Sequence, residues 1–273
     1  MLKNYRKMSI QSRVKTSIAL NIEKAANRLG KTINFDHPNR RFPTLQPREN
    51  GYHEVSKSQI TTHSSTSLSQ FEYVQIGSGT NLAPGYLNID INDLQDATIS
   101  ISQDYQLDRQ ESLHYFRHDM RNGMPTELRQ LRGIYSCHFL EHLNKDDGTN
   151  FLKDSFNRLA PGGLFRVVVP DFEFWAKAYT HRKKKFLMWY QRNYLANWDI
   201  VTSECTILNG MIYNYGHACM YDFKTMKSKL SKLGFANIKR KTWSNSDLPN
   251  MKCLENSLNY HQYESLLVEC KKP

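Results

Sequence analysis

The run LFRVVVPDF at residues 164–172 most constrains the fold, because apolar residues fall on both faces of an extended chain. A strand buried on both sides is typical of the middle of a parallel sheet. Four earlier segments predict further strands: FEYVQIGSG (71–79), YLNIDI (86–91), LHYFRHDM (113–120) and RGIYSCHFL (132–140). An amphipathic helix within 147–163 precedes the run, and a helix at 223–233 and closing strands at 237–243 and 265–270 follow it. Strands that alternate with helices predict a doubly wound α/β domain.

The chain divides into an arm, a linker and the α/β domain. Apolar residues three or four apart between Ile10 and Leu29, with Lys and Arg between them, predict a basic amphipathic helix over residues 1–30. Residues 31–70 hold three prolines and a Ser/Thr-rich run, which predicts a linker. The domain then occupies residues 71–273, and 172–216 form an insertion in it.

The basic charge is concentrated in the arm. Residues 1–48 hold 11 of the 37 Lys and Arg residues and only Glu23 and Asp36 as acids. Such an arm attracts lipid head groups, glycans or nucleic acid, and the alternative is a solvated tail that aids solubility. Its amphipathic helix could lie on a membrane surface, dock on the domain or pair with another chain. No apolar run approaches the roughly 20 residues that span a bilayer, and the five scattered cysteines indicate a reducing compartment. We therefore expect a cytoplasmic protein, with membrane-peripheral placement as the alternative.

A glycine loop follows the first predicted strand of the domain. Gly77-Ser78-Gly79 lets a ligand approach the main chain at the carboxyl end of that strand, where ligands bind in open α/β sheets. Asp90 ends the second strand, where a carboxylate can accept from both hydroxyls of a ribose. Asp119 ends the third strand, where an acid can accept from an adenine amino group. A dinucleotide fingerprint would need glycine at Leu82, and no phosphate-binding loop is present. These features predict an adenosine without phosphate, of which S-adenosylmethionine is the obvious example.

Five segments in order resemble a known family. VQIGSGTNLAPGYLNIDI, HDMRNGMP, IYSCHFLEHL, FLKDSFNRLAPGGLFRVVVPDF and GHACMYD are similar to the class I S-adenosylmethionine-dependent methyltransferases, in particular a type 11-like bacterial group. The resemblance covers about residues 71–273 and implies a Rossmann-like sheet of seven mostly parallel strands with the last one reversed. About seven residues join Gly79 to the second strand, so the first helix of the family is reduced here to one turn at most.

The resemblance also implies which residues hold the cofactor, S-adenosylmethionine. The glycine loop lies against the methionine part, Asp90 against the ribose, and Asp119 and Met120 against the adenine, while residues 136–138 form the floor beside the sulfonium. The full predicted set is Gly77, Ser78, Gly79, Asp90, Ile91, Asp119, Met120 and Ser136.

The segment HFLEH, residues 138–142, also matches a zinc-peptidase pattern. A zinc hydrolase needs both histidines on one helical face and a third ligand, whereas His138 is predicted at a strand-to-helix junction. Zinc hydrolysis is therefore a remote alternative, and no metal site is assigned. For methyl transfer to a hydroxyl or amine, the candidate general bases are His138, His217 and Asp171.

The insertion at 172–216 is rich in aromatic residues and includes the basic run HRKKKF. In the family, an insertion there commonly covers the acceptor. Aromatic walls with cationic groups suit a small molecule or a glycan, so methyl transfer to oxygen or nitrogen of such an acceptor is the predicted function. The alternatives are an RNA methyltransferase and a non-catalytic module that keeps the cofactor fold and is anchored by the basic arm.

Overall fold

The computed structural model describes residues 52–95, 97–102, 104–108, 111–181, 183–195, 203–213, 215–256 and 260–273. The predicted helix over residues 1–30 and the first part of the linker lie outside the described residues. No helix in the described ranges is both long enough and apolar enough to cross a bilayer.

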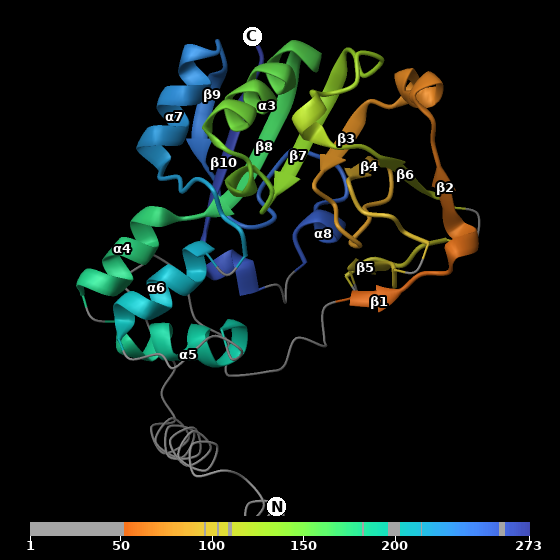
Figure 1. Ribbon diagram of the computed structural model, residues 1–273. Helices are drawn as coiled ribbons and strands as arrows, with labels where there is room; N and C mark the ends of the chain where they lie inside the picture. The colour runs from red at the N-terminus through yellow and green to blue at the C-terminus, as the bar shows by residue number, and fades with distance from the viewer. Residues whose placement is uncertain are drawn as a thin grey trace, which may run out of the picture. The chain divides into compact units, whose positions relative to one another are not determined.

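An eight-stranded mixed sheet forms the centre of the domain (Figure 1). Its order is β2-β6-β4-β3-β7-β8-β10-β9. The strands are β2 (Ile60–Thr62), β6 (Leu113–Arg117), β4 (Leu87–Asp90), β3 (Tyr73–Ile76), β7 (Leu131–Cys137), β8 (Leu159–Pro170), β10 (Ser265–Lys271) and β9 (Ala236–Arg240). Neighbours from β2 to β8 are parallel, and β10 is antiparallel to both β8 and β9. The predicted doubly wound, mostly parallel sheet with a reversed last strand is confirmed, but it has eight strands where seven were predicted, because the edge strand β2 adds one.

The edge strand β2 differs from the sequence prediction, which placed residues 31–70 in a linker. Ile60, Thr61 and Thr62 pair in parallel register with Leu113, His114 and Tyr115 of β6. A second short strand, β1 (Tyr52–Glu54), pairs with β5 (Ser100–Ser102) in a separate two-stranded sheet. The sheet domain therefore begins before Phe71. Three-residue strands carry too weak a periodic signal to be found in a Ser/Thr-rich run.

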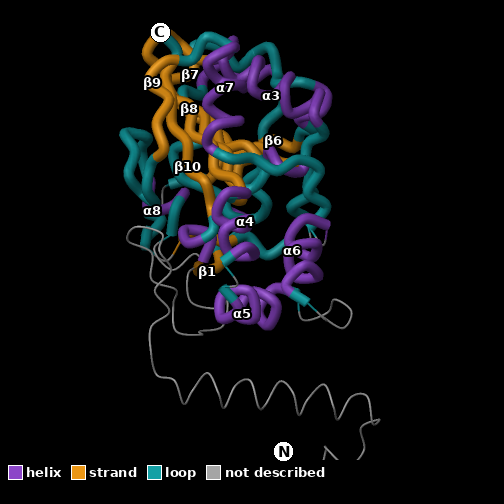
Figure 2. Tube along the Cα trace, turned by 90° about the vertical axis from the view of Figure 1, so that its left-hand side faces the viewer, coloured by secondary structure: helices purple, strands orange, loops and turns teal. Residues whose placement is uncertain are grey.

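Helices cover the sheet unequally. The helices α3 (Lys145–Arg158) and α7 (Phe223–Lys232) lie on one face, and the short α8 (Met251–Leu254) lies on the other (Figure 2). Asn144 and Asp222 cap α3 and α7 by accepting from amides of the first turn.

As predicted, the described residues between β3 and β4 contain no helix. The remaining turns are the 3-10 helices η1 (Lys57–Gln59), η2 (Ser65–Gln70), η3 (Met120–Asn122), η4 (Leu140–His142) and η5 (Tyr260–Tyr263).

Three helices of the insertion lie together beyond one end of the sheet in both views (Figures 1 and 2). They are α4 (Phe172–Thr180), α5 (Lys184–Tyr194) and α6 (Glu204–Tyr213). Because Pro170 ends β8 and Asp171 caps α4 directly, this end is the carboxyl end of the parallel strands. The insertion thus lies next to the edge where an α/β sheet binds ligands.

Alternation along β8 places its side chains in two different cores. On β8, Phe165, Val167 and Val169 face the core that contains α3 and α7, and Leu164 and Val168 face the core beneath residues 248–254. Arg166 also faces the second side and is fully buried. The sequence predicted a strand apolar on both faces, so a buried guanidinium in it is unexpected.

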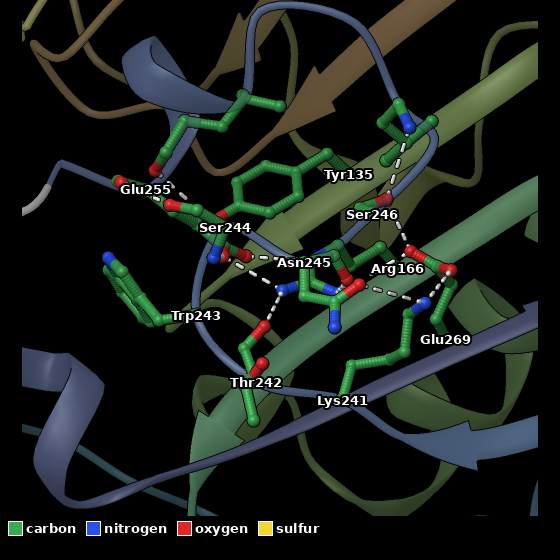
Figure 3. A network of polar contacts seen from close by, with 12 residues as sticks. Tyr135, Arg166, Lys241, Thr242, Trp243, Ser244, Asn245, Ser246, Glu255 and Glu269 are labelled. Atoms are coloured by element: carbon green, nitrogen blue, oxygen red, sulfur yellow. Dashed lines mark hydrogen bonds and ion pairs between the residues drawn. The ribbon is translucent and has the colours of Figure 1, made fainter. Parts of the chain in front are cut away.

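A polar network compensates the charge of Arg166 (Figure 3). Its Nε and Nη2 donate to the two carboxylate oxygens of Glu255 at 2.6 and 2.8 Å. Nη2 also donates to the carbonyl oxygen of Thr242 at 2.9 Å, and Nη1 lies 3.4 Å from Oε2 of Glu269. Such a bidentate pair is the strong form of an arginine–carboxylate contact. The network fixes residues 242–255 over the sheet face that lacks a long helix.

Candidate active site

The glycine loop and the second-strand acid form one unit at the tips of β3 and β4. Gly77 and Gly79 have φ angles of +70° and +55°, which favour glycine. The amide of Gly77 donates to the Ile89 carbonyl at 2.9 Å, and that of Gly79 donates to Oδ2 of Asp90 at 2.8 Å. The other oxygen of Asp90 accepts from the Asn92 amide at 3.0 Å. Since a carboxylate offers about four acceptor sites, Asp90 keeps capacity for hydroxyl donors.

The two glycines differ in their surroundings. A Cβ built on Gly77 would lie 2.6 Å from the Cβ of Phe139, so Gly77 is required by the close packing of Phe139. A Cβ on Gly79 would have no atom within 4 Å. The open side of the turn is therefore at Gly79. Ile91, next to Asp90, is 49% exposed and leaves an apolar side chain near the tip of β4.

Asp119 and Met120 lie at the end of β6. Asp119 caps η3 through the Arg121 amide and also pairs with the Arg121 guanidinium at 2.6 Å. These hydrogen bonds lower the pKa of Asp119 to about 2. Met120 is buried and packs in the core under α3. The structure thus gives both residues internal contacts, which the sequence did not reveal.

Ser136 lies on β7, one residue before the end of that strand, and pairs with Ile76, the last residue of β3. It is fully buried, and its Oγ has no hydrogen-bond partner among the described residues. A buried hydroxyl without a partner is uncommon. Its position beside the glycine loop fits a polar contact to a bound molecule.

His138 is held in a strained turn directly after β7. Its φ is +50°, and its amide donates to the Val168 carbonyl at 2.9 Å. Nε2 lies 2.8 Å from the Ser265 hydroxyl and Nδ1 lies 3.0 Å from Oε1 of Glu141. The ring also lies against His261, with centroids 3.8 Å apart. These contacts fix the orientation of the imidazole, as a general base requires.

The second histidine candidate, His217, approaches from the end of the insertion. Its ring centroid lies 4.9 Å from that of His142, so the segment after α6 meets η4. Burial lowers the pKa of His217, which keeps the imidazole neutral at pH 7. Its Nδ1 is buried and has no hydrogen-bond partner among the described residues.

The third candidate, Asp171, has a structural environment. It is fully buried and caps α4 by accepting from the amides of Glu173 and Phe174. Its Oδ2 accepts from the guanidinium of Arg240 at 2.8 Å. Both carboxylate oxygens of Asp171 are thus engaged by other residues of the chain. The sequence could not show the second contact, because Arg240 lies 69 residues away.

Sequence reasoning missed two residues of this cluster, His261 and Glu264. Nδ1 of His261 lies 3.0 Å from Oε1 of Glu264, whose other oxygen accepts from the Trp175 indole at 2.9 Å. Burial raises the pKa of the Glu264 carboxyl. The i, i+3 spacing of the two residues was the only signal, and it becomes meaningful only because β10 starts at the carboxyl edge of the sheet.

Most aromatic residues of the insertion pack on one another. Trp175 contacts Phe174, Phe186 and Tyr190 at centroid distances of 4.6 to 6.2 Å. Tyr179 and Tyr213, by contrast, are exposed. A cavity of about 400 Å³ lies among α4, α5 and α6, lined by Tyr179, Thr180, Lys184 and Glu204. It includes no residue of the strand tips, so it is separate from the glycine turn.

No protein-family model matches the chain, and no curated protein matches it significantly. Solved structures show low similarity. A SAM-dependent methyltransferase from Archaeoglobus fulgidus is 13% identical with a TM-score of 0.43, over 75% of this chain and 88% of that one. A SAM-dependent methyltransferase from Thermotoga maritima is 15% identical with a TM-score of 0.42, over 74% and 82%. Phosphoethanolamine N-methyltransferase 2 of Haemonchus contortus, in complex with S-adenosyl-L-methionine, is 10% identical with a TM-score of 0.41, over 74% and 49%. Similarities this low do not assign an activity to the chain.

Proposed function

We propose that this protein transfers a methyl group from S-adenosylmethionine to an oxygen or nitrogen of a small molecule or glycan. The observation that carries the proposal is the joined unit of Gly79 and Asp90 at the tips of β3 and β4. It combines an open main-chain turn with a carboxylate that has acceptor capacity left. An adenosine without phosphate fits such a turn, because the loop lacks the machinery that cradles phosphate.

In the proposed complex, Asp90 accepts from the ribose hydroxyls and the turn at Gly79 lies along the methionine part. Ile91 supplies an exposed apolar contact for the adenine, and the unpaired Ser136 hydroxyl faces a polar group of the cofactor. The residues around Asp119 contribute main-chain contacts, since the Asp119 side chain is paired with Arg121. The cofactor, when bound, supplies an activated methyl group.

The chain's own task is then to align the acceptor and to remove its proton. His138 and His217 are the candidate bases, and both lie at the carboxyl edge of β7 beside the insertion. His138 is oriented by Glu141 and Ser265, whereas His217 offers an unpaired nitrogen on a neutral ring. A neutral imidazole accepts a proton near pH 7. Asp171 is the weaker candidate because Arg240 holds its carboxylate.

Calorimetry with the full chain tests the cofactor part of the proposal. S-adenosylmethionine and S-adenosylhomocysteine should bind with one site, and ATP should bind at least tenfold more weakly because its phosphates have no partners. Tight ATP binding, or no binding of either adenosyl ligand, would refute the proposed cofactor site.

Release of S-adenosylhomocysteine with a panel of hydroxyl, amine, glycan and RNA acceptors tests the transfer. Turnover with a small molecule or glycan supports the proposal. Turnover with RNA alone would assign the acceptor to nucleic acid instead, and cofactor binding without turnover across the panel would favour a non-catalytic module.

A further inference from the structure

Two groups of metal-ligating side chains meet at the carboxyl edge of β7. The first consists of Glu141, His142 and His217, and the second of His138, His261 and Glu264. Within each group, one ligand atom from every residue lies within 4.8 Å of the others. A cation bound at about 2.1 Å to each ligand brings ligand atoms to roughly 3 to 4 Å from one another. Shifts of a few tenths of an ångström to about an ångström would therefore complete either group.

The two groups differ in how their polar atoms are satisfied. In the second group, His138 bonds Ser265, His261 contacts Glu264, and Glu264 accepts from Trp175. Each residue of that group therefore has a polar partner. In the first group, by contrast, Oε2 of Glu141 and Nδ1 of His217 have no hydrogen-bond partner among the described residues.

Glu141 is the decisive residue of the first group. Its side chain is 0% exposed, and neither carboxylate oxygen accepts a hydrogen bond from the described residues. Nδ1 of His138 lies 3.0 Å from Oε1, but Oε2 has no ion-pair contact there. A buried carboxylate is strongly disfavoured in its ionised form unless a cation or hydrogen bonds compensate the charge.

The other two ligands fit a coordinated cation. His217 has a buried Nδ1 without a hydrogen-bond partner among the described residues, and an imidazole nitrogen with a free lone pair can bind a metal ion. His142 is exposed, which gives a cation access from solvent. The main chain fixes the arrangement, since the amides of Ala218 and Cys219 donate to the Glu141 carbonyl at 2.7 and 3.1 Å.

We infer that Glu141, His142 and His217 form a binding site for a first-row divalent transition-metal ion such as Zn²⁺. Two imidazoles and one carboxylate are ligands that such ions prefer, whereas Mg²⁺ and Ca²⁺ prefer oxygen ligands throughout. Three protein ligands leave coordination positions open. This site is not the peptidase arrangement of HFLEH, because His138 precedes the 3-10 helix η4 that ends at His142, and the two imidazoles contact different partners.

The inference goes beyond the proposed function and does not depend on it. Metal coordination at His217 would leave His138 as the proton acceptor in the proposed transfer. Cation binding is measurable without cofactor or acceptor, so failure of one proposal leaves the other intact.

The test is a titration of chelator-treated, full-length protein with Zn²⁺ by calorimetry and with Co²⁺ by visible absorption. One equivalent should bind with a Kd in the micromolar range or below, and Co²⁺ should give the d–d bands of a site with nitrogen ligands. Mg²⁺ at the same concentrations should not compete. If no binding is detected at Zn²⁺ concentrations 100-fold above the micromolar range, the inference is overturned.

Variants locate the site. His142→Ala and His217→Ala should each weaken Zn²⁺ binding at least tenfold, and His142 is exposed, so its replacement leaves the fold intact. The matched control, His181→Ala, removes an exposed histidine at the end of α4 and should leave the affinity unchanged. If His261→Ala abolishes binding while His142→Ala does not, the ion belongs to the other group and the assignment is wrong.

Discussion

The amide of Gly79 donates a 2.8 Å hydrogen bond to the carboxylate of Asp90, so the turn after β3 and the acid that ends β4 hold each other in place. The two residues are 11 positions apart, and the parallel pairing of β3 with β4 brings them together. Any ligand that Asp90 binds is therefore presented to a turn of fixed shape.

Replacing Asp90 by Ala should weaken binding of S-adenosylmethionine tenfold or more, because a charge-assisted hydrogen bond contributes about 1.5 kcal/mol. The loss of the bond to Gly79 also loosens the turn. Calorimetry gives the change in Kd. Asp93→Ala is the control, since the Asp93 carboxylate is exposed and pairs with Arg117 at the end of β6, a strand that does not neighbour β3. Equal affinities of Asp90→Ala and the natural protein would remove Asp90 from the cofactor site.

Gly77→Ala should destabilise the fold more than Gly162→Ala. Both glycines have positive φ angles, +70° and +79°, so both substitutions cost about 1 kcal/mol of backbone strain. Only at Gly77 does the added methyl meet another atom, the Cβ of Phe139 at 2.6 Å. The overlap adds roughly 1 to 3 kcal/mol. Urea unfolding measures both variants, and equal losses would contradict the packing of Phe139 on Gly77.

Arg166→Met should lower the free energy of unfolding by about 3 to 5 kcal/mol, because Glu255 is left as a buried, unpaired carboxylate. Arg132→Met removes an exposed pair with Glu72 and should change stability by less than about 1 kcal/mol. The double variant Arg166→Met with Glu255→Leu should recover part of the loss. A recovery would show that the cost comes from the unpaired charge.

The fold should lose stability as the pH falls from 7 towards 5, partly through His63 and His114. Burial lowers the pKa of both imidazoles, and Nε2 of His63 lies 3.0 Å from Nδ1 of His114. Below pH 6.5 the unfolded chain takes up protons that the folded pair resists, so the free energy of unfolding decreases with falling pH. Urea unfolding between pH 5 and 7.5 measures this slope. His114→Gln should make it shallower, and His181→Ala, an exposed histidine, should not.

The sequence predicted those features that depend on a few consecutive residues. Periodicity gave the alternation of strands and helices, and the reduced spacing after Gly79 predicted the missing first helix. The glycine loop and Asp90 were recognisable because each follows directly on a strand.

The tertiary structure decided the contacts between distant segments of the chain. His217 meets Glu141 and His142 only because the insertion folds back over the edge of β7, and Asp171 is held by Arg240 only because β9 lies near α4. Arg166 is compensated by Glu255, 89 residues further along the chain. Turn and strand preferences act over a few residues, whereas the position of a charge relative to its partner depends on strand order and loop path, which no single stretch of the sequence contains.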